Sequence, residues 1–439
     1  MLEIKGLLRI AGSLSGMVLV RLVGVLLTFA VGITIARLGG PAMLGAFQLY
    51  NTWMVTLAEV GGMGLPTVAL REVSKQHNRT SWRNTRDFIA KIVGMGVSGM
   101  LLVSLLIVAL IALFSFLSAD RLPVHILIAI PASISFLALR IHVESLKGQG
   151  KRIQAVIKES ALVPLVLILL LVAGETWGVT WSGKNIAIVH AFIISALVFG
   201  SLFLMGILKR SLKELSLPKP TLIAQDSRSL WLGSLINLSL LYLPFYFLPW
   251  YSDESGTGIF SAAYRLVMIA VTLLIVIAAW FGPRMARAYA NNDHQGLKME
   301  IRQARWFSVL GYLPFFLLCW FFGDHLLAMF GEAFRGSTDI LLILCLGQLV
   351  NALTGLPGLH LNMVGLSRIE TTISVTSLAI GALLHLILGS LWGSLGIAVA
   401  FTLTVSLKNI TSFAASRLVL SGKANKAISK HINSYSYIR

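Results

Sequence analysis

The sequence predicts an all-α polytopic membrane protein with twelve transmembrane helices, arranged as two six-helix lobes with both termini in the cytoplasm. Three observations predict this class. Hydrophobic residues make up 56% of the chain and charged residues only 12%, which is too little charge to cover a soluble globule. Apolar runs of about twenty residues, enough to cross ~30 Å of hydrocarbon, recur along the chain. Basic residues gather in alternate connections, as cytoplasmic loops do under the positive-inside rule.

The apolar runs define the expected spans. They lie at 10–36, 43–69, 88–117, 123–146, 160–176, 185–208, 230–250, 257–282, 304–322, 339–362, 370–389 and 394–417. The first run is too long for the core of a signal peptide, so we expect it to remain as the first helix.

The longest inner connection falls near the middle of the chain and contains Pro218 and Pro220. It divides the chain into four expected regions. These are an N-terminal lobe at 1–208, a cytoplasmic linker at 209–229, a C-terminal lobe at 230–417 and a basic cytoplasmic tail at 418–439.

A faint internal repeat supports the division. Gly45-Ala46-Phe47 resembles Gly258-Ile259-Phe260, and Arg152-Ile153 matches Arg368-Ile369 at nearly the same offset. Because each half has an even number of spans, the halves enter the membrane in the same sense. The repeats are therefore expected to be parallel.

The net charge of +18 follows from the basic inner loops. It indicates topology and contact with acidic lipid headgroups, and it does not favour a nucleic-acid partner. Cys319 and Cys345 both fall in apolar runs, so we expect them to be packing residues.

The histidines in or near spans are not spaced as metal ligands. They are His142, His190, His360 and His385. We expect hydrogen-bonded core histidines and no metal site.

The first two spans carry one charge each near mid-depth. Arg21 shares a helical face with the small residues Gly24, Thr28 and Gly32, so this face should point into a bundle. On the second span, Asn51, Thr52, Thr56 and Glu59 share one side, and the run Gly61 to Pro66 then weakens the helix. A charge is costly inside a bilayer and persists where it faces protein or water. An interrupted helix beside such a charge suggests a site.

Three more basic residues lie within spans. Arg265 and Lys408 each share a stripe with hydroxyl residues, and the alternative is that they snorkel to a headgroup. Arg140 lies one turn before Glu144, which favours an intrahelical ion pair. Glu59 is either a counter-ion to an arginine or a protonatable coupling residue, and the sequence leaves both open.

The candidate site residues follow from these patterns. The proposed cavity cations are Arg21, Arg265, Lys408 and Arg140, the coupling residue or counter-ion is Glu59, and the polar or aromatic candidates are Asn51, Thr56, Asn237, Tyr242 and Tyr246. The tyrosines could stack on sugar or drug rings, although such residues more often form an aromatic belt. A cavity lined by arginines attracts anions, and the guanidinium fork suits phosphate.

Several of these stretches resemble the first helices of polysaccharide-export flippases of the Wzx kind, in the multidrug/oligosaccharidyl-lipid/polysaccharide (MOP) exporter superfamily. The stretches are Ile35 to Pro41, Leu44 to Phe47, Glu59 to Pro66, Leu70 to Glu72 and the loop Leu146 to Lys151. Family members often have Asp at the position of Glu59.

The resemblance implies a V-shaped pair of lobes around a cationic cavity lined by helices one, two, seven and eight. It also implies alternating access that moves an undecaprenyl-diphosphate-linked oligosaccharide, such as an O-antigen repeat unit, to the periplasmic leaflet of the bacterial inner membrane. The alternatives are a drug or cation antiporter of the same superfamily and a membrane glycosyltransferase or polymerase.

From this resemblance we expect a transporter without catalytic residues, metal or organic cofactor, and with H⁺ or Na⁺ as a candidate coupling ion. The expected partners are the lipid-linked oligosaccharide and membrane lipids. A polysaccharide polymerase and a chain-length regulator are further candidates. We expect a monomer.

Overall fold

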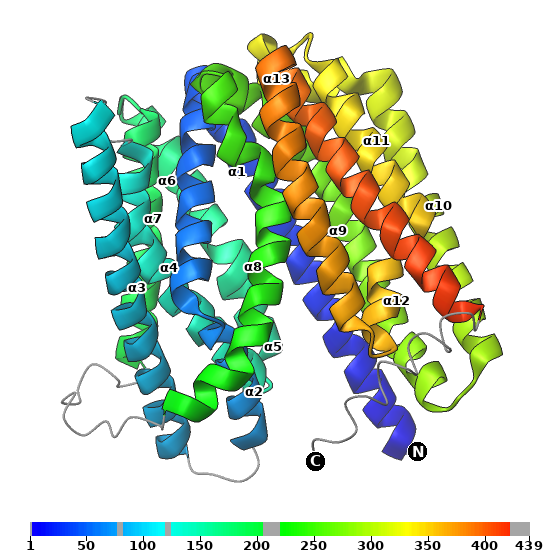
Figure 1. Cartoon of the computed structure of the whole chain (residues 1–439). Coiled ribbons are helices and arrows are strands. Elements are labelled where there is room, and N and C mark those ends of the chain that lie inside the picture. Colours follow the sequence, from blue (N-terminus) through cyan, green and yellow to red (C-terminus); the bar gives the residue numbers. More distant parts are fainter. Residues whose placement is uncertain (1, 77–81, 119–123, 205–219, 422–439) are drawn as a thin grey trace. The chain divides into compact units, whose positions relative to one another are not determined.

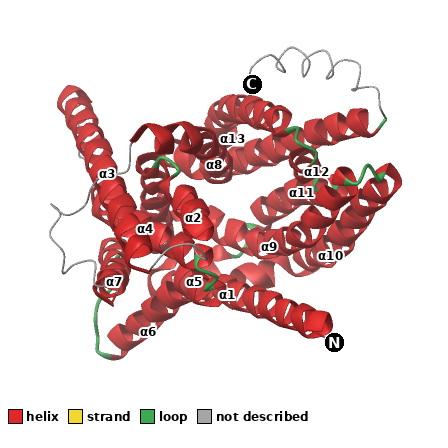
Figure 2. Cartoon of the chain, turned by 90° about the horizontal axis from the view of Figure 1, so that it is seen from below, coloured by secondary structure: helices red, strands yellow, loops and turns green. Residues whose placement is uncertain are grey.

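A computed structural model describes residues 2–76, 82–118, 124–204 and 220–421 (Figure 1). These residues form helices joined by short connections, and they contain no strand (Figure 2). Residues 209–219 of the expected linker and 422–439 of the expected tail lie outside the described part. The sidedness of the termini and the division at 208 and 230 stay predictions.

The contacts divide the chain into two units. The first comprises Met1–Phe245, Asp253–Ser261 and Phe330–Ala333, and the second comprises the rest. In the first unit, α4 packs against α1, α2, α3 and α7. Its helices are α1 (Leu2–Gly62), α2 (Leu65–Gln76), α3 (Trp82–Ser118), α4 (Val124–Gly148), α5 (Arg152–Val156), the π-helical turn η1 (Ile157–Ala161), α6 (Leu162–Thr176), α7 (Gly183–Leu204) and most of α8 (Pro220–Tyr251).

The second unit contains most of α9 and the helices that follow it. In this unit α11 packs against α10 and α13, and α12 packs against α13. Cys319 and Cys345 are both buried and free, so their predicted packing role is confirmed. The helices are α9 (Glu254–Ala290), α10 (His294–Ala328), α11 (Thr338–Thr354), α12 (Pro357–Met363) and α13 (Ser367–Leu420), and the 3-10 turn η3 (Glu332–Phe334) precedes α11.

Glycines interrupt the long helices where the sequence predicts turns. Gly39 and Gly40 leave helical geometry inside α1, and Gly40 has φ +69°, a conformation that glycine adopts without steric cost. Met63 (φ +45°) and Gly64 (φ +77°) separate α1 from α2. Gly393 (φ +57°) bends α13. Both α1 and α13 therefore carry two predicted spans each.

Nine described helices are long and apolar enough to cross a membrane, or ten if the bent pair α11 and α12 counts as one span. Because α1 and α13 each contain two predicted spans, this set accommodates all twelve predicted ranges. The all-helical polytopic fold is confirmed.

The two glycines matched by the internal repeat meet at one helix crossing in the first unit. A Cβ built on Gly45 would lie 1.9 Å from the backbone oxygen of Glu254, and one built on Gly258 would lie 1.8 Å from that of Pro41. One turn further on, the Ser261 hydroxyl donates a hydrogen bond to the Gln48 side-chain oxygen at 3.3 Å. The crossing thus requires glycine on both helices, since any side chain would collide with backbone.

The four histidines within or near spans make local contacts. Nδ1 of His190 lies 3.1 Å from the Tyr50 hydroxyl, and Nδ1 of His360 lies 2.8 Å from the Ser416 hydroxyl. His385 contacts the carbonyl of Gly381 within its own helix, and His142 contacts a lysine described below. No group of three or more His, Cys, Asp or Glu in the described ranges is placed to hold a metal ion.

Candidate functional site

Glu59 lies three residues before the end of α1. A helix end leaves its last carbonyl groups without intrahelical partners. The indole N–H of Trp231, on α8, donates to the backbone oxygen of Glu59 at 2.9 Å. The Glu59 carbonyl, near the end of α1, therefore accepts a hydrogen bond from α8 at a buried position.

The Glu59 side chain is only 8% exposed, and both of its oxygens are occupied. Oε2 accepts a hydrogen bond from the guanidinium of Arg140 on α4, and Oε1 accepts one from the hydroxyl of Ser234 on α8. A buried carboxylate is tolerated when it is paired and hydrogen-bonded in this way. Helices α1, α4 and α8 are thus joined at one side chain.

The predicted pairing of Arg140 with Glu144 is wrong. Glu144 instead accepts from Lys147 at 2.7 Å, and the same lysine lies 2.8 Å from Glu159. Arg140 reaches across to α1, where no other cation of the described residues pairs with the buried Glu59 carboxylate, whereas Glu144 already has Lys147 one turn away. In this structure Glu59 acts as the counter-ion of Arg140.

Arg21 lies on α1, about one turn before Gly24. Gly24 and Gly32 on the same face are buried, and a Cβ on Gly24 would lie 2.7 Å from the Ser160 side chain in η1. Arg21 itself is exposed. Within the described ranges it forms no hydrogen bond or ion pair, so its full charge is available to a ligand.

Lys158 is a basic residue that the sequence analysis left out of the spans. It lies in η1, and its ammonium is 2.9 Å from the Ser201 hydroxyl and 3.1 Å from Nε2 of His142. Both partners are neutral acceptors or donors, and no described carboxylate pairs with it. The residue was assigned to a loop because the fifth span was expected to begin at 160, whereas the apolar helical segment begins at Arg152.

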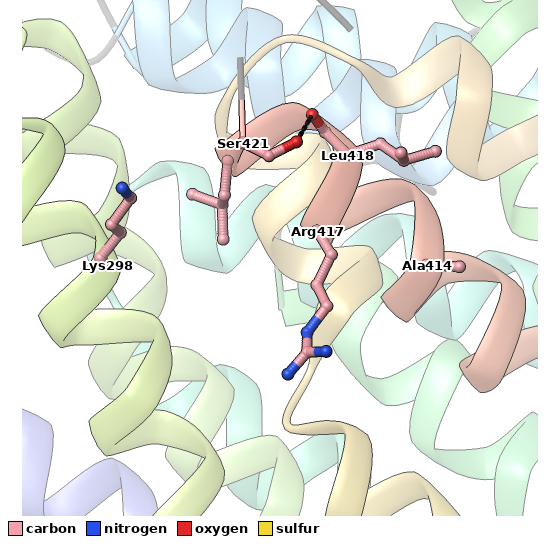
Figure 3. Close-up of a pocket in the computed structure, with 6 residues that line it drawn as sticks. Lys298, Ala414, Arg417, Leu418 and Ser421 are labelled. Atoms are coloured by element: carbon pink, nitrogen blue, oxygen red, sulfur yellow. Dashed lines mark hydrogen bonds between the residues drawn. The ribbon is translucent and has the colours of Figure 1, made fainter. Parts of the chain in front are cut away.

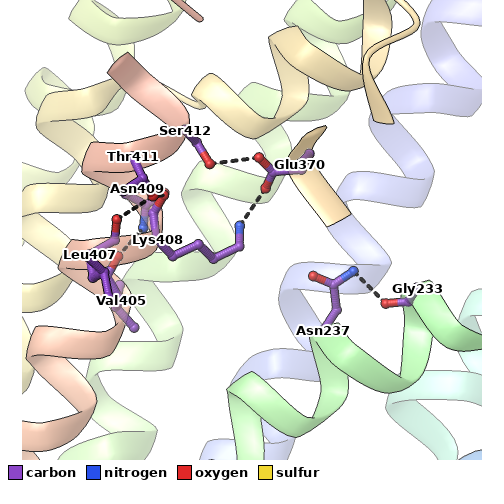
Figure 4. Close-up of polar contacts among 9 residues, drawn as sticks. All are labelled: Gly233, Asn237, Glu370, Val405, Leu407, Lys408, Asn409, Thr411 and Ser412. Carbon is purple, nitrogen blue, oxygen red and sulfur yellow. Dashed lines mark hydrogen bonds and ion pairs between the residues drawn. The ribbon is translucent and has the colours of Figure 1, made fainter. Parts of the chain in front are cut away.

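Lys408 in the second unit is held by an acid that the sequence analysis also missed. Its ammonium lies 2.8 Å from Oε1 of Glu370, and the Ser412 hydroxyl donates to Oε2 of Glu370 at 2.7 Å (Figure 4). Glu370 is buried. Glu370 lies at the first position of a predicted span, where an acidic residue is typical of the adjoining loop. The charge of Lys408 is therefore neutralised within this unit.

The other predicted site residues are placed on α1, α8 and α9. Asn237 is exposed, and its amide donates to the Gly233 carbonyl at 2.9 Å (Figure 4). The remaining candidates, Asn51, Thr56, Tyr242, Tyr246 and Arg265, are all partly exposed. Of the predicted set, the structure brings Glu59 and Arg140 together. The assembly of the set into one cavity stays a prediction.

The charges within the spans leave a positive excess in the first unit. Glu59 and Glu144 are each paired with a base, whereas Arg21 and Lys158 have no carboxylate partner among the described residues. Cations that lack a carboxylate partner are suited to an anionic ligand, because an unpaired charge is costly in a bilayer.

Residues 13–289, more than half of the chain, match the family described as polysaccharide biosynthesis protein. The chain belongs to the polysaccharide biosynthesis protein family. Residues 232–391 of this family member also match the MatE family.

A curated relative is the probable low-salt glycan biosynthesis flippase Agl15 of Haloferax volcanii, 25% identical over 248 residues, 53% of this chain and 51% of the relative. This polysaccharide biosynthesis protein thus spans about half the length of the curated relative that it matches.

Solved structures share its fold. An inward-facing multidrug resistance MATE family transporter of the MOP superfamily superposes with a TM-score of 0.68 at 17% identity, covering 92% of this chain and 98% of the transporter. A MOP superfamily transporter from Pyrococcus furiosus, described as having a binding pocket of reverse polarity, gives 0.61 at 16% identity over 93% of this chain and 95% of its own. At these identities the likeness shows the fold alone, which this chain shares with these transporters.

Proposed function

We propose that this member of the polysaccharide biosynthesis protein family is a flippase. Its substrate would be an undecaprenyl-diphosphate-linked oligosaccharide, an O-antigen or similar repeat unit. The protein would move it by alternating access from the cytoplasmic to the periplasmic leaflet of a bacterial inner membrane. The observation that carries this proposal is the positive charge that remains in the first unit once the acids there are paired.

A diphosphate in the hydrocarbon layer needs cations, because desolvation of a free anion is very costly. Arg21 is exposed and has its guanidinium fork free of described partners, and such a fork matches two phosphate oxygens at once. Arg140 is 36% exposed at its side chain, so part of its guanidinium is open while another part holds Glu59. The lipid tail can remain in the bilayer during the movement.

The comparison with Agl15, itself described as a probable glycan biosynthesis flippase, supports a glycan-linked lipid as the substrate. The rival function is a drug or cation antiporter, which the MatE match over residues 232–391 favours. A site for a cationic drug would hold unpaired acids. In the described spans Glu59 and Glu370 are instead neutralised by Arg140 and Lys408.

The experiment is reconstitution of the full chain in vesicles that carry a fluorescent undecaprenyl-diphosphate oligosaccharide in both leaflets. An impermeant quencher added outside should bleach about half of the dye in protein-free vesicles and nearly all of it when the protein is present. A fluorescent phosphatidylcholine in the same vesicles is the control and should stay half protected. Uptake of a lipophilic cationic dye without flipping of the diphosphate lipid would establish the antiporter instead.

We further propose that transport is coupled to H⁺ or Na⁺ through Glu59. Protonation of Glu59 would remove the charge that holds Arg140, which would then be free to bind a phosphate. Glu59→Gln keeps the size and hydrogen bonding of the side chain without its charge, and we expect it to transport more slowly than Glu59→Asp.

The role of Glu59 is resolved by measuring flipping with and without a pH gradient. If Glu59 couples protons, the Gln variant still binds substrate but no longer responds to the gradient. If Glu59 is only a counter-ion, the Gln variant loses substrate binding. Glu144→Gln, which removes an acid paired with Lys147, is the matched control and should keep the wild-type response. Equal transport by the Gln and wild-type proteins would exclude both roles.

A further inference from the structure

A largely open cavity of about 650 Å³ lies in the second unit, where α10 begins and α13 ends. Its lining residues are Lys298, Ala414, Arg417, Leu418, Leu420 and Ser421. Figure 3 shows that Lys298 and Arg417 belong to two different helices that flank this space. The volume is within the range of ~300–1,000 Å³ typical of sites for small ligands.

Two cations line the cavity, and a third shares an aromatic ring with one of them. Lys298 and Arg417 line the cavity, and the guanidinium carbons of Arg417 and Arg305 lie 4.9 and 4.6 Å from the ring centroid of Phe413. The Nε atom of Arg305 is buried without a hydrogen-bond partner. None of the three forms an ion pair with a carboxylate in the described ranges. Two guanidinium groups therefore share one ring without an anion to relieve their repulsion.

The nearest acids in sequence are already engaged elsewhere. Asp293 caps α10 by accepting a hydrogen bond from the Gly296 N–H at 2.8 Å. Glu300 faces Arg284 on α9 at 3.5 Å. Neither lines the cavity, so the positive potential there is not cancelled by these carboxylates.

The rest of the wall is apolar. Leu418 is 55% exposed, and Leu420 packs against the hydrophobic core of the unit. Ser421 donates its hydroxyl to the Leu418 carbonyl at 2.9 Å (Figure 3) and its N–H to the Arg417 carbonyl at 3.0 Å. Cations beside an exposed leucine fit a ligand with an anionic head and an apolar body.

We propose that this cavity binds an anionic phospholipid, with the headgroup phosphate between Lys298 and Arg417 and an acyl chain along Leu418. The positive-inside rule predicts that this end of the unit lies at the cytoplasmic leaflet, and basic pockets between transmembrane helices on that side suit acidic headgroups. A soluble phosphate would satisfy the cations but would leave the apolar wall exposed. The site does not depend on the identity of the transported substrate.

The test measures binding of phosphatidylglycerol and phosphatidylcholine to the full-length protein in neutral detergent by native mass spectrometry. The Lys298→Gln/Arg417→Gln protein should bind phosphatidylglycerol at least about tenfold more weakly, because each cation near a membrane surface contributes noticeably to the attraction of acidic lipid. Phosphatidylcholine binding should not change. Lys298→Gln alone alters an exposed side chain and should show part of the loss, which provides a test if the double variant unfolds.

The matched control is Arg287→Gln/Arg302→Gln, which removes the same charge from exposed positions of α9 and α10 that do not line the cavity. It should retain wild-type binding. An equal loss of phosphatidylglycerol binding in both double variants would show that the loss reflects general electrostatic attraction. This result would overturn the proposed site. Equal affinity of the wild-type protein for both lipids, or displacement of phosphatidylglycerol by millimolar inorganic phosphate, would also overturn it.

Discussion

Arg21→Ala is expected to abolish flipping of a diphosphate-linked lipid while the protein still inserts and folds. Arg21 is exposed and makes no contact with a described polar group, so its removal costs the fold little. Loss of a charged group that binds a desolvated phosphate costs about 2–5 kcal/mol, which corresponds to a fall in transport of roughly 30-fold or more. Initial flipping rates in proteoliposomes, at matched protein content, measure the effect.

Two variants accompany this measurement. Arg21→Lys should keep only partial activity, since a single ammonium cannot replace the bidentate fork. Arg37→Ala removes another exposed arginine of α1, near the Gly39–Gly40 bend, and should transport normally. Wild-type rates in the Arg21→Ala protein would remove this residue from the substrate site.

The ion pair between Glu59 and Arg140 is expected to dominate the stability of the contact between α1 and α4. Breaking a buried pair from one side costs about 3–5 kcal/mol, because the remaining charge is left without a partner. Arg140 is 36% exposed, so we expect about 2–3 kcal/mol for Arg140→Gln, which strands the buried Glu59 carboxylate. The Glu59→Gln/Arg140→Gln protein should be more stable than Arg140→Gln alone.

The midpoint of thermal unfolding in detergent, compared across the four proteins of this cycle, measures the coupling. Ser234→Ala removes only a hydroxyl donor to the same carboxylate and should cost about 1–3 kcal/mol. Strictly additive shifts of the two Gln substitutions would show that the charges do not interact in the folded protein.

Local features of the fold could be predicted because single residues determine them. Gly40 and Gly64 adopt positive φ, a geometry that glycine adopts freely. Gly40 lies between the first two predicted spans, and Gly64 lies in the run that is predicted to weaken the second span. The burial of Gly24 and Gly32 also follows from helical periodicity. Such features depend on a few neighbouring residues, so their pattern is visible in the chain.

The ion-pair partners could not be predicted, because they join residues far apart in sequence. Arg140 lies within reach of Glu144 along one helix, and only the packing of α4 against α1 shows that Glu59 is its partner. Glu370 was not singled out for the same reason, since its partner Lys408 is 38 residues away in the chain. The helical segment that carries Lys158 begins at Arg152, whereas the apolar run begins at 160. The apolar run therefore could not predict the first turns of this helix.

The glycine crossing of α1 and α9 offers a practical reference point for spectroscopy. Since no side chain separates the backbones at Gly45 and Gly258, repacking of side chains cannot loosen this junction. Ala42 is exposed and Ser255 partly exposed beside the crossing. Probes at these two positions would report, through a change in their separation, whether this junction stays closed or opens when substrate is added.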